Sequence, residues 1–85
     1  MNIDEFLSKL DEGDKQRLKT LDVNRCTVVR IGDGEMATVC KIDAGRFKIL
    51  QRIVIQPQEI VNIKKEDLDL EFTINNLDSV PLKKD

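Results

Sequence analysis

The pair Asp33-Gly34 is the feature that most constrains the fold of this chain. It lies between CTVVRI (26–31) and MATVCKI (36–42), two segments that are rich in β-branched residues. Asp-Gly readily adopts the positive φ angles of a two-residue hairpin turn. The sequence therefore predicts an antiparallel hairpin here, built from two strands that follow one another along the chain.

Further turns and strands extend this hairpin. Ala44-Gly45 is a weaker turn signal before RFKILQRIVI (46–55), and LDLEFTI (68–74) alternates between polar and apolar side chains. Pro57 is expected to end the long strand at a sheet edge, and IVNI (60–63) to begin another short strand. Asn75-Asn76 is expected to turn the chain toward a short tail, 78–85. We therefore predict an antiparallel meander of four or five strands over residues 26–74.

The segment 2–21 has a helical pattern. Apolar side chains occupy positions 3, 6, 7 and 10, the spacing of one face of an amphipathic helix. Asn2, with Glu5 three residues later, has the spacing of a capping box. Gly13 is expected to interrupt the helix and Asp14 to cap a second short turn, so residues 2–21 form either one kinked helix or two.

These patterns predict one α+β domain, 1–85, with a helical segment before the meander. Both faces of the predicted sheet carry apolar residues. Either the helical segment covers one face, or the sheet curls into a small SH3-like barrel.

The two turn signals also predict a register. Ile31 would lie opposite Met36, and Cys40 opposite Ile49. One face would then be the apolar core, made of Val29, Ile31, Met36, Cys40, Ile42, Phe47, Ile49 and Ile53. In the last strand, Leu70 and Phe72 are expected to face this core.

The opposite face would carry basic side chains among aliphatic ones: Arg30, Lys41, Lys48 and Arg52 with Val39 and Leu50. Such a face suits an acidic protein partner or a nucleic-acid backbone. It lacks the aromatic side chains on which single-stranded bases stack. The alternative is that Asp69 and Glu71 neutralise these bases as cross-strand pairs.

The two cysteines offer little chemistry. With no histidine in the chain, Cys26 and Cys40 are too few for a four-ligand zinc site. The predicted register buries Cys40 in the core and leaves Cys26 on the other face. We therefore expect no intrachain disulfide, and no metal or other cofactor.

Charge and hydropathy bound the setting of the protein. The net charge of −2 combines acidic ends with a basic middle, because residues 15–52 carry nine bases and four acids. The N-terminus is acidic and amphipathic, unlike a signal peptide, and no apolar run approaches the roughly 18 residues of a membrane span. A cytoplasmic protein that does not enter the membrane is expected.

Residues 52–72 are similar in part to the swapped-hairpin transition-regulator and antitoxin family. That family has an I-P-K-E-I-R-like segment before a G-D-x-L-E-F hairpin, and here the segments are IVIQPQEIV and KKEDLDLEF. The chain departs from the pattern at Gln56, Val61 and Glu66. No family is assigned on this basis.

Without histidine, tyrosine or a cysteine beside a base, acid–base and nucleophilic catalysis have few candidates. We expect a small non-catalytic, intracellular regulatory protein that binds another protein, as an adaptor, inhibitor or antitoxin-like module. The alternative is a nucleic-acid-binding module that uses the basic face. A homodimer is also expected, through the exposed 26–32 strand edge or the helix stripe of Ile3, Phe6 and Leu10.

Overall fold

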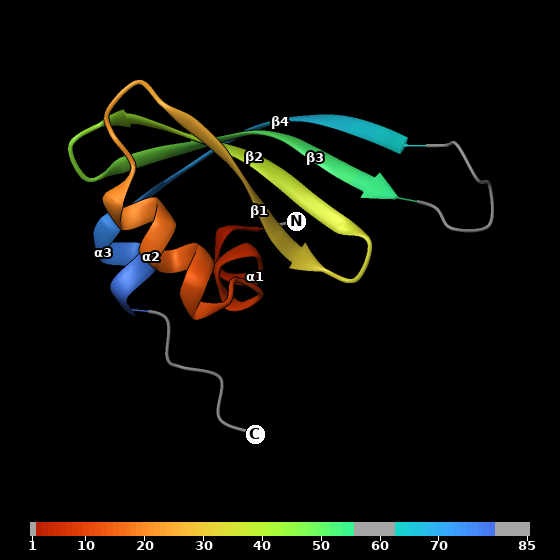
Figure 1. Cartoon of the computed structure of the whole chain (residues 1–85), viewed down its shortest axis with the longest axis horizontal. Helices are drawn as coiled ribbons and strands as arrows, with labels where there is room; N and C mark the ends of the chain where they lie inside the picture. The colour runs from red at the N-terminus through yellow and green to blue at the C-terminus, as the bar shows by residue number, and fades with distance from the viewer. Residues whose placement is uncertain (1, 56–62, 80–85) are drawn as a thin grey trace.

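The computed structural model describes residues 2–55 and 63–79 (Figure 1). Two short helices, α1 (Ile3–Ser8) and α2 (Glu12–Thr20), come first. The strands β1 (Cys26–Gly32), β2 (Glu35–Asp43), β3 (Arg46–Ile55) and β4 (Ile63–Thr73) follow, and then the helix α3 (Ile74–Ser79). The predicted α+β class is confirmed.

Two separate helices form at the N-terminus because each has its own cap. Asn2 Oδ1 accepts the amide of Glu5 at 2.7 Å, as the capping-box spacing predicted. Asp11 Oδ1 accepts the amide of Asp14 at 2.7 Å and so caps α2. The predicted cap at Asp14 is therefore wrong. Asp11 stands three residues before an amide that its carboxylate can reach, so α2 begins earlier and includes Gly13.

The sheet is open. Its strand order is β1-β2-β3-β4, every neighbouring pair is antiparallel, and β1 and β4 are the two edges. The barrel alternative is wrong, because the three helices cover one face of the sheet and bury it without closure (Figure 1). β4 is a single long strand in a region where two shorter strands were predicted. Pro57 and the start of the predicted IVNI strand lie outside the described residues.

Both predicted turns are present, but a bulge beside each one shifts the register. Gly32 pairs with Glu35 across the first turn, yet Arg30 rather than Ile31 lies opposite Met36. The second turn has the same irregularity, because Ile42 has no partner between two paired residues of β2. Each bulge adds one residue to one strand. Gly32, with a φ of 150°, adopts a backbone conformation that few other residues tolerate.

A third bulge, at Leu50, exchanges the two faces of β3. Val39 pairs with Ile49 and Thr38 with Gln51, so Leu50 has no partner on β2. Beyond the bulge, Arg52 lies opposite the buried Ala37, on the face that the helices cover. We call this face the helix side, and the opposite one the open face.

The core lies between the helices and the sheet. Phe6 of α1 and Phe47 of β3 both pack on Phe72 of β4, with ring centroids 5.8 and 5.0 Å apart. Burying each of these side chains contributes about 1.5–3 kcal/mol to folding. Phe72 faces the core as predicted, and the half-buried Leu70 packs against the same cluster.

Helix α3 replaces the turn predicted at Asn75-Asn76. Asn76 Oδ1 accepts the amide of Thr73 at 2.9 Å, and the amide of Asn76 donates to Thr73 Oγ1 at 3.1 Å. The helical turn also buries Leu77, which an exposed turn would leave in water. The predicted tail, 78–85, therefore begins inside α3, and its residues 80–85 lie outside the described part of the chain.

Candidate binding surface

The six residues predicted to form one basic face are divided by the bulges. Arg30 and Lys48 lie on the open face, Leu50 is a bulge residue, and Val39, Lys41 and Arg52 lie on the helix side. The predicted shared face is therefore wrong. A binding role for each residue on its own stays a prediction.

Lys48 is neutralised on the open face by β4. Its Nζ lies 2.9 Å from Asp69 Oδ1, and its strand partner is Glu71. The neighbouring Arg46 donates to Glu71 Oε1 at 2.9 Å. The hydrogen bond to Asp69 raises the pKa of Lys48 above its ordinary value. The alternative of cross-strand neutralisation by Asp69 and Glu71 is thus confirmed for Lys48.

Arg52 is engaged on the helix side. Its guanidinium donates to Glu35 of β2, and at 3.2 Å to Glu66 Oε2 of β4. The bond to Glu35 is the main cause of a raised pKa for Arg52. Among the described residues, its Nε is buried without a hydrogen-bond partner. This network links three strands, because Arg52 of β3 joins Glu35 of β2 to Glu66 of β4.

Three of the six residues have other surroundings. Val39 is fully buried in the core. Lys41 places its Nζ 5.7 Å from the centre of the Phe47 ring, a cation–π contact. Leu50, at its bulge, is 40% exposed.

The open face carries a row of side chains across all four strands. The row runs Arg30, Met36, Ile53, Lys65, in the order β1 to β4. Its two cations make no ion pair with any residue that the structure describes. Beside the row, Ile55 and Ile63 pair with each other and are both exposed. This end of the open face is therefore apolar with a cation at each edge.

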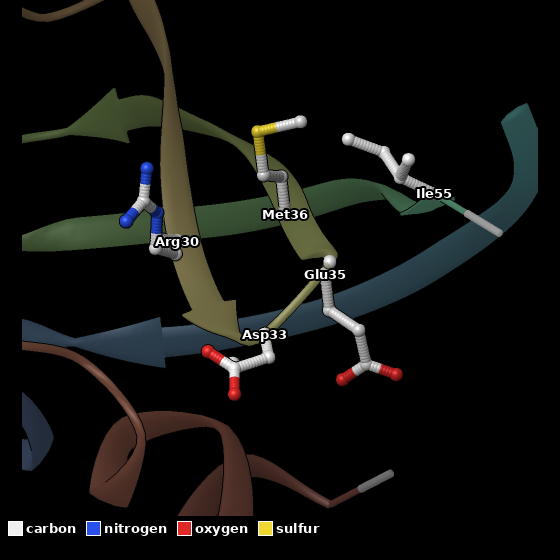
Figure 2. Close-up of a pocket in the computed structure, with 7 residues that line it drawn as sticks. Arg30, Asp33, Glu35, Met36 and Ile55 are labelled. Atoms are coloured by element: carbon white, nitrogen blue, oxygen red, sulfur yellow. The ribbon is translucent and has the colours of Figure 1, made fainter. Parts of the chain in front are cut away.

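A pocket of about 280 Å³ lies at the same end, beside the β1–β2 turn (Figure 2). Arg30 borders it on one side and Asp33 and Glu35 on the other, with Met36 and Ile55 contributing apolar surface. Glu35 is already bonded to Arg52. The charged groups of the pocket are therefore of mixed sign, and one of them is already paired. This arrangement does not favour a ligand of one particular charge.

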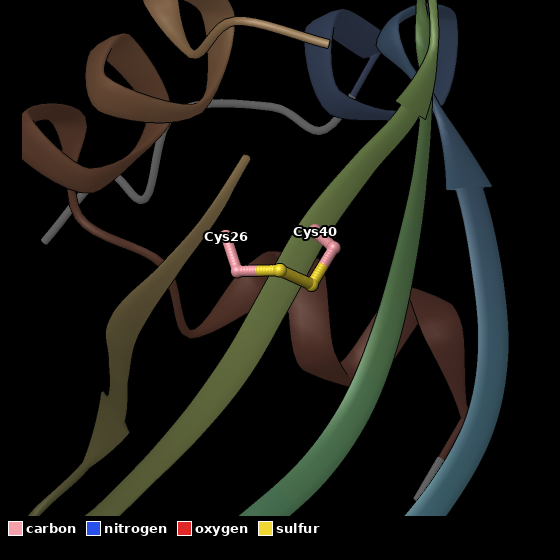
Figure 3. Close-up of a disulfide and its surroundings, with 2 residues drawn as sticks. All are labelled: Cys26 and Cys40. Atoms are coloured by element: carbon pink, nitrogen blue, oxygen red, sulfur yellow. A yellow bond between two sulfur atoms is a disulfide. The ribbon is translucent and has the colours of Figure 1, made fainter. Parts of the chain in front are cut away.

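Cys26 and Cys40 form a disulfide between β1 and β2 (Figure 3). They are direct strand partners, with Cα atoms 3.9 Å apart. The amide of Lys41 donates to Arg25 O beside them, so they form a pair without mutual backbone hydrogen bonds, in which side chains lie closest. The prediction of two unpaired cysteines on opposite faces is wrong, because the bulge at Ile31 shifts β1 by one residue.

Side chains of α2 cover the outer edge of β1. Asp14 Oδ2 accepts the backbone amide of Arg30 at 3.1 Å, and Arg17 Nη2 donates to the carbonyl of Val28 at 3.2 Å. Asp14 and Arg17 are themselves joined at 3.0 Å. The pair thus satisfies outward-facing backbone groups of β1 as a neighbouring strand would. The 26–32 edge, which was predicted to be the more open edge, is covered.

Apart from the amide of Thr73, which donates to Asn76 Oδ1, the outer edge of β4 has no comparable cover from the described residues. The amide of Ile74 donates to Gly45 O, on the β3 side. Since successive residues of a strand direct their backbone groups to opposite sides, the amides of Asp67, Asp69 and Glu71 point away from β3. We call this the free edge of β4.

Sequence reasoning missed Asp14 and Arg17 as edge-covering residues. Their i, i+3 spacing is a visible signal of an ion pair on one helix face. Which strand edge that face meets depends on tertiary packing, so no local pattern could show it.

The chain matches no protein-family model, and searches of curated proteins and of solved structures find no significant match. In the described part of the chain, no helix is long and apolar enough to span a membrane.

Proposed function

We propose that this chain is a small, non-catalytic, intracellular regulatory protein that acts by binding another protein. Adaptor, inhibitor and antitoxin-like roles are forms of this one activity. The observation that carries the proposal is the difference between the two sheet edges: α2 covers the edge of β1, while no described residue bonds the outward backbone groups of β4 before Thr73.

An exposed strand edge is a template for another strand, because its unpaired amides and carbonyls can continue the sheet. Proteins commonly protect such edges when they do not use them. Here one edge is protected by a buried carboxylate, Asp14, while the other, on a strand of eleven residues, is bonded by a described residue only at Thr73. A binding role for β4 accounts for this difference.

The adjacent open face supports the same proposal. Exposed apolar side chains gather near β4, among them Ile55 and Ile63, which is 58% exposed. Contiguous exposed apolar surface is a common mark of protein contact sites.

The chemistry of the described side chains also supports a non-catalytic role. Both thiols are in the disulfide, and Glu35 and Glu66 are both bonded to Arg52. The sequence has no histidine or tyrosine that could act as a general base.

Site-specific photo-crosslinking tests the proposal. A photoreactive residue at Asp67, whose backbone amide points away from β3, should capture a protein in cells that express the chain. The same residue at Gln16, an exposed position of α2, is the matched control and should capture little. Equal capture at both positions, or none at Asp67, would contradict the proposal.

The alternative function, nucleic-acid binding, requires a basic face that these side chains share. Lys48 and Arg52 are instead engaged by carboxylates on opposite faces of the sheet. A titration with duplex DNA and with RNA at two salt concentrations separates this function from protein binding. An affinity that falls steeply with salt would favour nucleic acid.

A further inference from the structure

We propose that the free edge of β4 binds an extended segment of a partner protein in which basic and apolar residues alternate. This inference rests on the proposed function and names the chemistry of the partner. It follows from the pattern of β4, from the strand that already pairs with its inner edge, and from the direction of its backbone amides.

The sequence of β4 alternates acidic and apolar residues next to its free edge. Asp67, Asp69 and Glu71 project on the open face, and Leu68 and Leu70 on the helix side. Both leucines are only partly buried against the core. A strand added at this edge would therefore have acidic neighbours on one face and apolar neighbours on the other.

The inner edge of β4 shows which sequence suits this pattern. β3 begins with Arg46, Phe47, Lys48 and Ile49, so that basic and apolar residues alternate along it. Lys48 forms an ion pair with Asp69, and Arg46 forms one with Glu71. Phe47 and Ile49 are the strand partners of Phe72 and Leu70. β4 presents the same acidic and apolar side chains next to its free edge. This edge therefore selects a segment in which basic and apolar residues alternate as they do in β3.

The carboxylates of β4 keep capacity for such a partner. Lys48 contacts Oδ1 of Asp69, whose side chain is 83% exposed, and Arg46 contacts Oε1 of Glu71. The other oxygen of each has no partner among the described residues, and Asp67 has no ion pair there at all. Incoming cations can bind these oxygens without displacing Arg46 or Lys48.

A second copy of this chain is a poorer occupant of the edge. In a two-fold antiparallel pair of identical strands, each residue lies opposite a residue of the other copy, and the two side chains project on the same face of the sheet. A register centred on Asp67 or on Leu68 sets aspartates opposite aspartates, which is destabilising. A partner of opposite pattern avoids this repulsion.

The test uses the full chain and a synthetic peptide of about ten residues, the length of a long strand, in which lysine and valine alternate. One control peptide has glutamate in place of lysine, and another has the same composition with lysines and valines in separate blocks. Binding is measured by titration calorimetry and mapped by amide NMR. The alternating peptide alone should bind, and it should slow amide exchange at Asp67, Asp69 and Glu71.

Variants separate the backbone contribution from the charge contribution. Asp69→Pro removes an outward amide, whereas Asp69→Ala removes only the carboxylate, so the proline variant should bind at least about tenfold more weakly than the alanine variant. Asp67→Lys should weaken binding about fivefold, while Asp22→Lys, the same charge change at an exposed site away from β4, should not. Spectra of the free variants confirm that each is folded.

Three results would overturn the inference. They are equal binding of the block or glutamate peptide, exchange protection elsewhere than β4, and a homodimer that Asp69→Pro dissociates. Failure of the peptide together with partner capture at Asp67 would leave the proposed function standing without this chemistry. Failure of capture would remove both.

Discussion

Removing the Cys26–Cys40 disulfide should lower the free energy of unfolding by about 3 kcal/mol. The bond closes a loop with a sequence separation of 14 residues. Constraining a loop of about 15 residues in the unfolded chain is worth about 3 kcal/mol in the chain-entropy account. For a domain of 60–100 residues this corresponds to a fall in Tm of roughly 12–24 °C.

The assay is urea unfolding of the oxidised chain, with and without a dithiol reductant, alongside the double variant Cys26→Ser/Cys40→Ser. Reductant should shift the oxidised chain to the midpoint of the double variant and leave the double variant unchanged. Thiol labelling of the native oxidised chain should find neither cysteine. After reduction, the exposed Cys26 should react before Cys40, which is only 7% exposed.

Coincident unfolding curves for all samples would refute the reasoning, because they would mean that the disulfide adds nothing to the free energy of unfolding. Rapid labelling of both thiols without reductant would refute the pairing itself. The result also bears on the intracellular location that we propose, since reducing compartments keep most thiols unpaired. A large stability difference would make the protein sensitive to its redox surroundings.

Three further predictions concern the turns, the core and the open face. Gly34→Ala should cost about 1–2 kcal/mol in urea unfolding, because Gly34 has a φ of 69° and a Cβ there would lie 3.1 Å from a backbone oxygen of β3. Phe72→Asp should abolish the folded circular dichroism spectrum, because it brings a charge into the core, and Leu70→Asp, at a half-buried position beside the core, should lower the stability; a normal spectrum for Phe72→Asp would show that β4 faces the other way. The pKa of Lys48 is raised by its bond to Asp69, so the stabilisation from this pair is present below pH 10.5 and is lost as pH rises through the raised pKa. NMR titration should show Lys48 deprotonating at higher pH than its ordinary value, and Asp69→Asn should reduce the difference, leaving the smaller effect of Glu71.

The features that the sequence predicted correctly depend on neighbouring residues. The N-terminal cap at Asn2, the turns at Asp33-Gly34 and Ala44-Gly45, and the facing of Phe72 all follow from local chemistry or from alternation. They were sufficient for the α+β class and the antiparallel meander, since each hairpin turn joins two strands that are adjacent in the chain.

The candidate surface was predicted poorly because faces are counted along a strand. A bulge at Ile31, Ile42 or Leu50 changes the parity of every residue beyond it. One skipped residue in β1 brings Cys26 opposite Cys40, and one in β3 moves Arg52 to the helix side. Hydrophobic pattern alone did not locate these bulges, because isoleucine and leucine fit either face.

The features missed altogether depend on contacts between distant segments. The cover of β1 by Asp14 and Arg17 requires α2 to lie beside that edge. Similarly, α3 requires a buried site for Leu77. Neither site exists until the tertiary structure has formed.

The packing of Phe6 on Phe72 has a consequence for synthesis on the ribosome. The β1-β2-β3-β4 order makes every strand pairing a contact between consecutive strands, so the hairpins can form in turn as the chain emerges. Phe6 must wait, because its aromatic partner lies 66 positions later in the sequence. Until β4 leaves the ribosome, the apolar stripe of α1 lacks that contact. Its docking on β4 joins α1 to the fourth strand of the sheet, and completes the core only after β4 has been made.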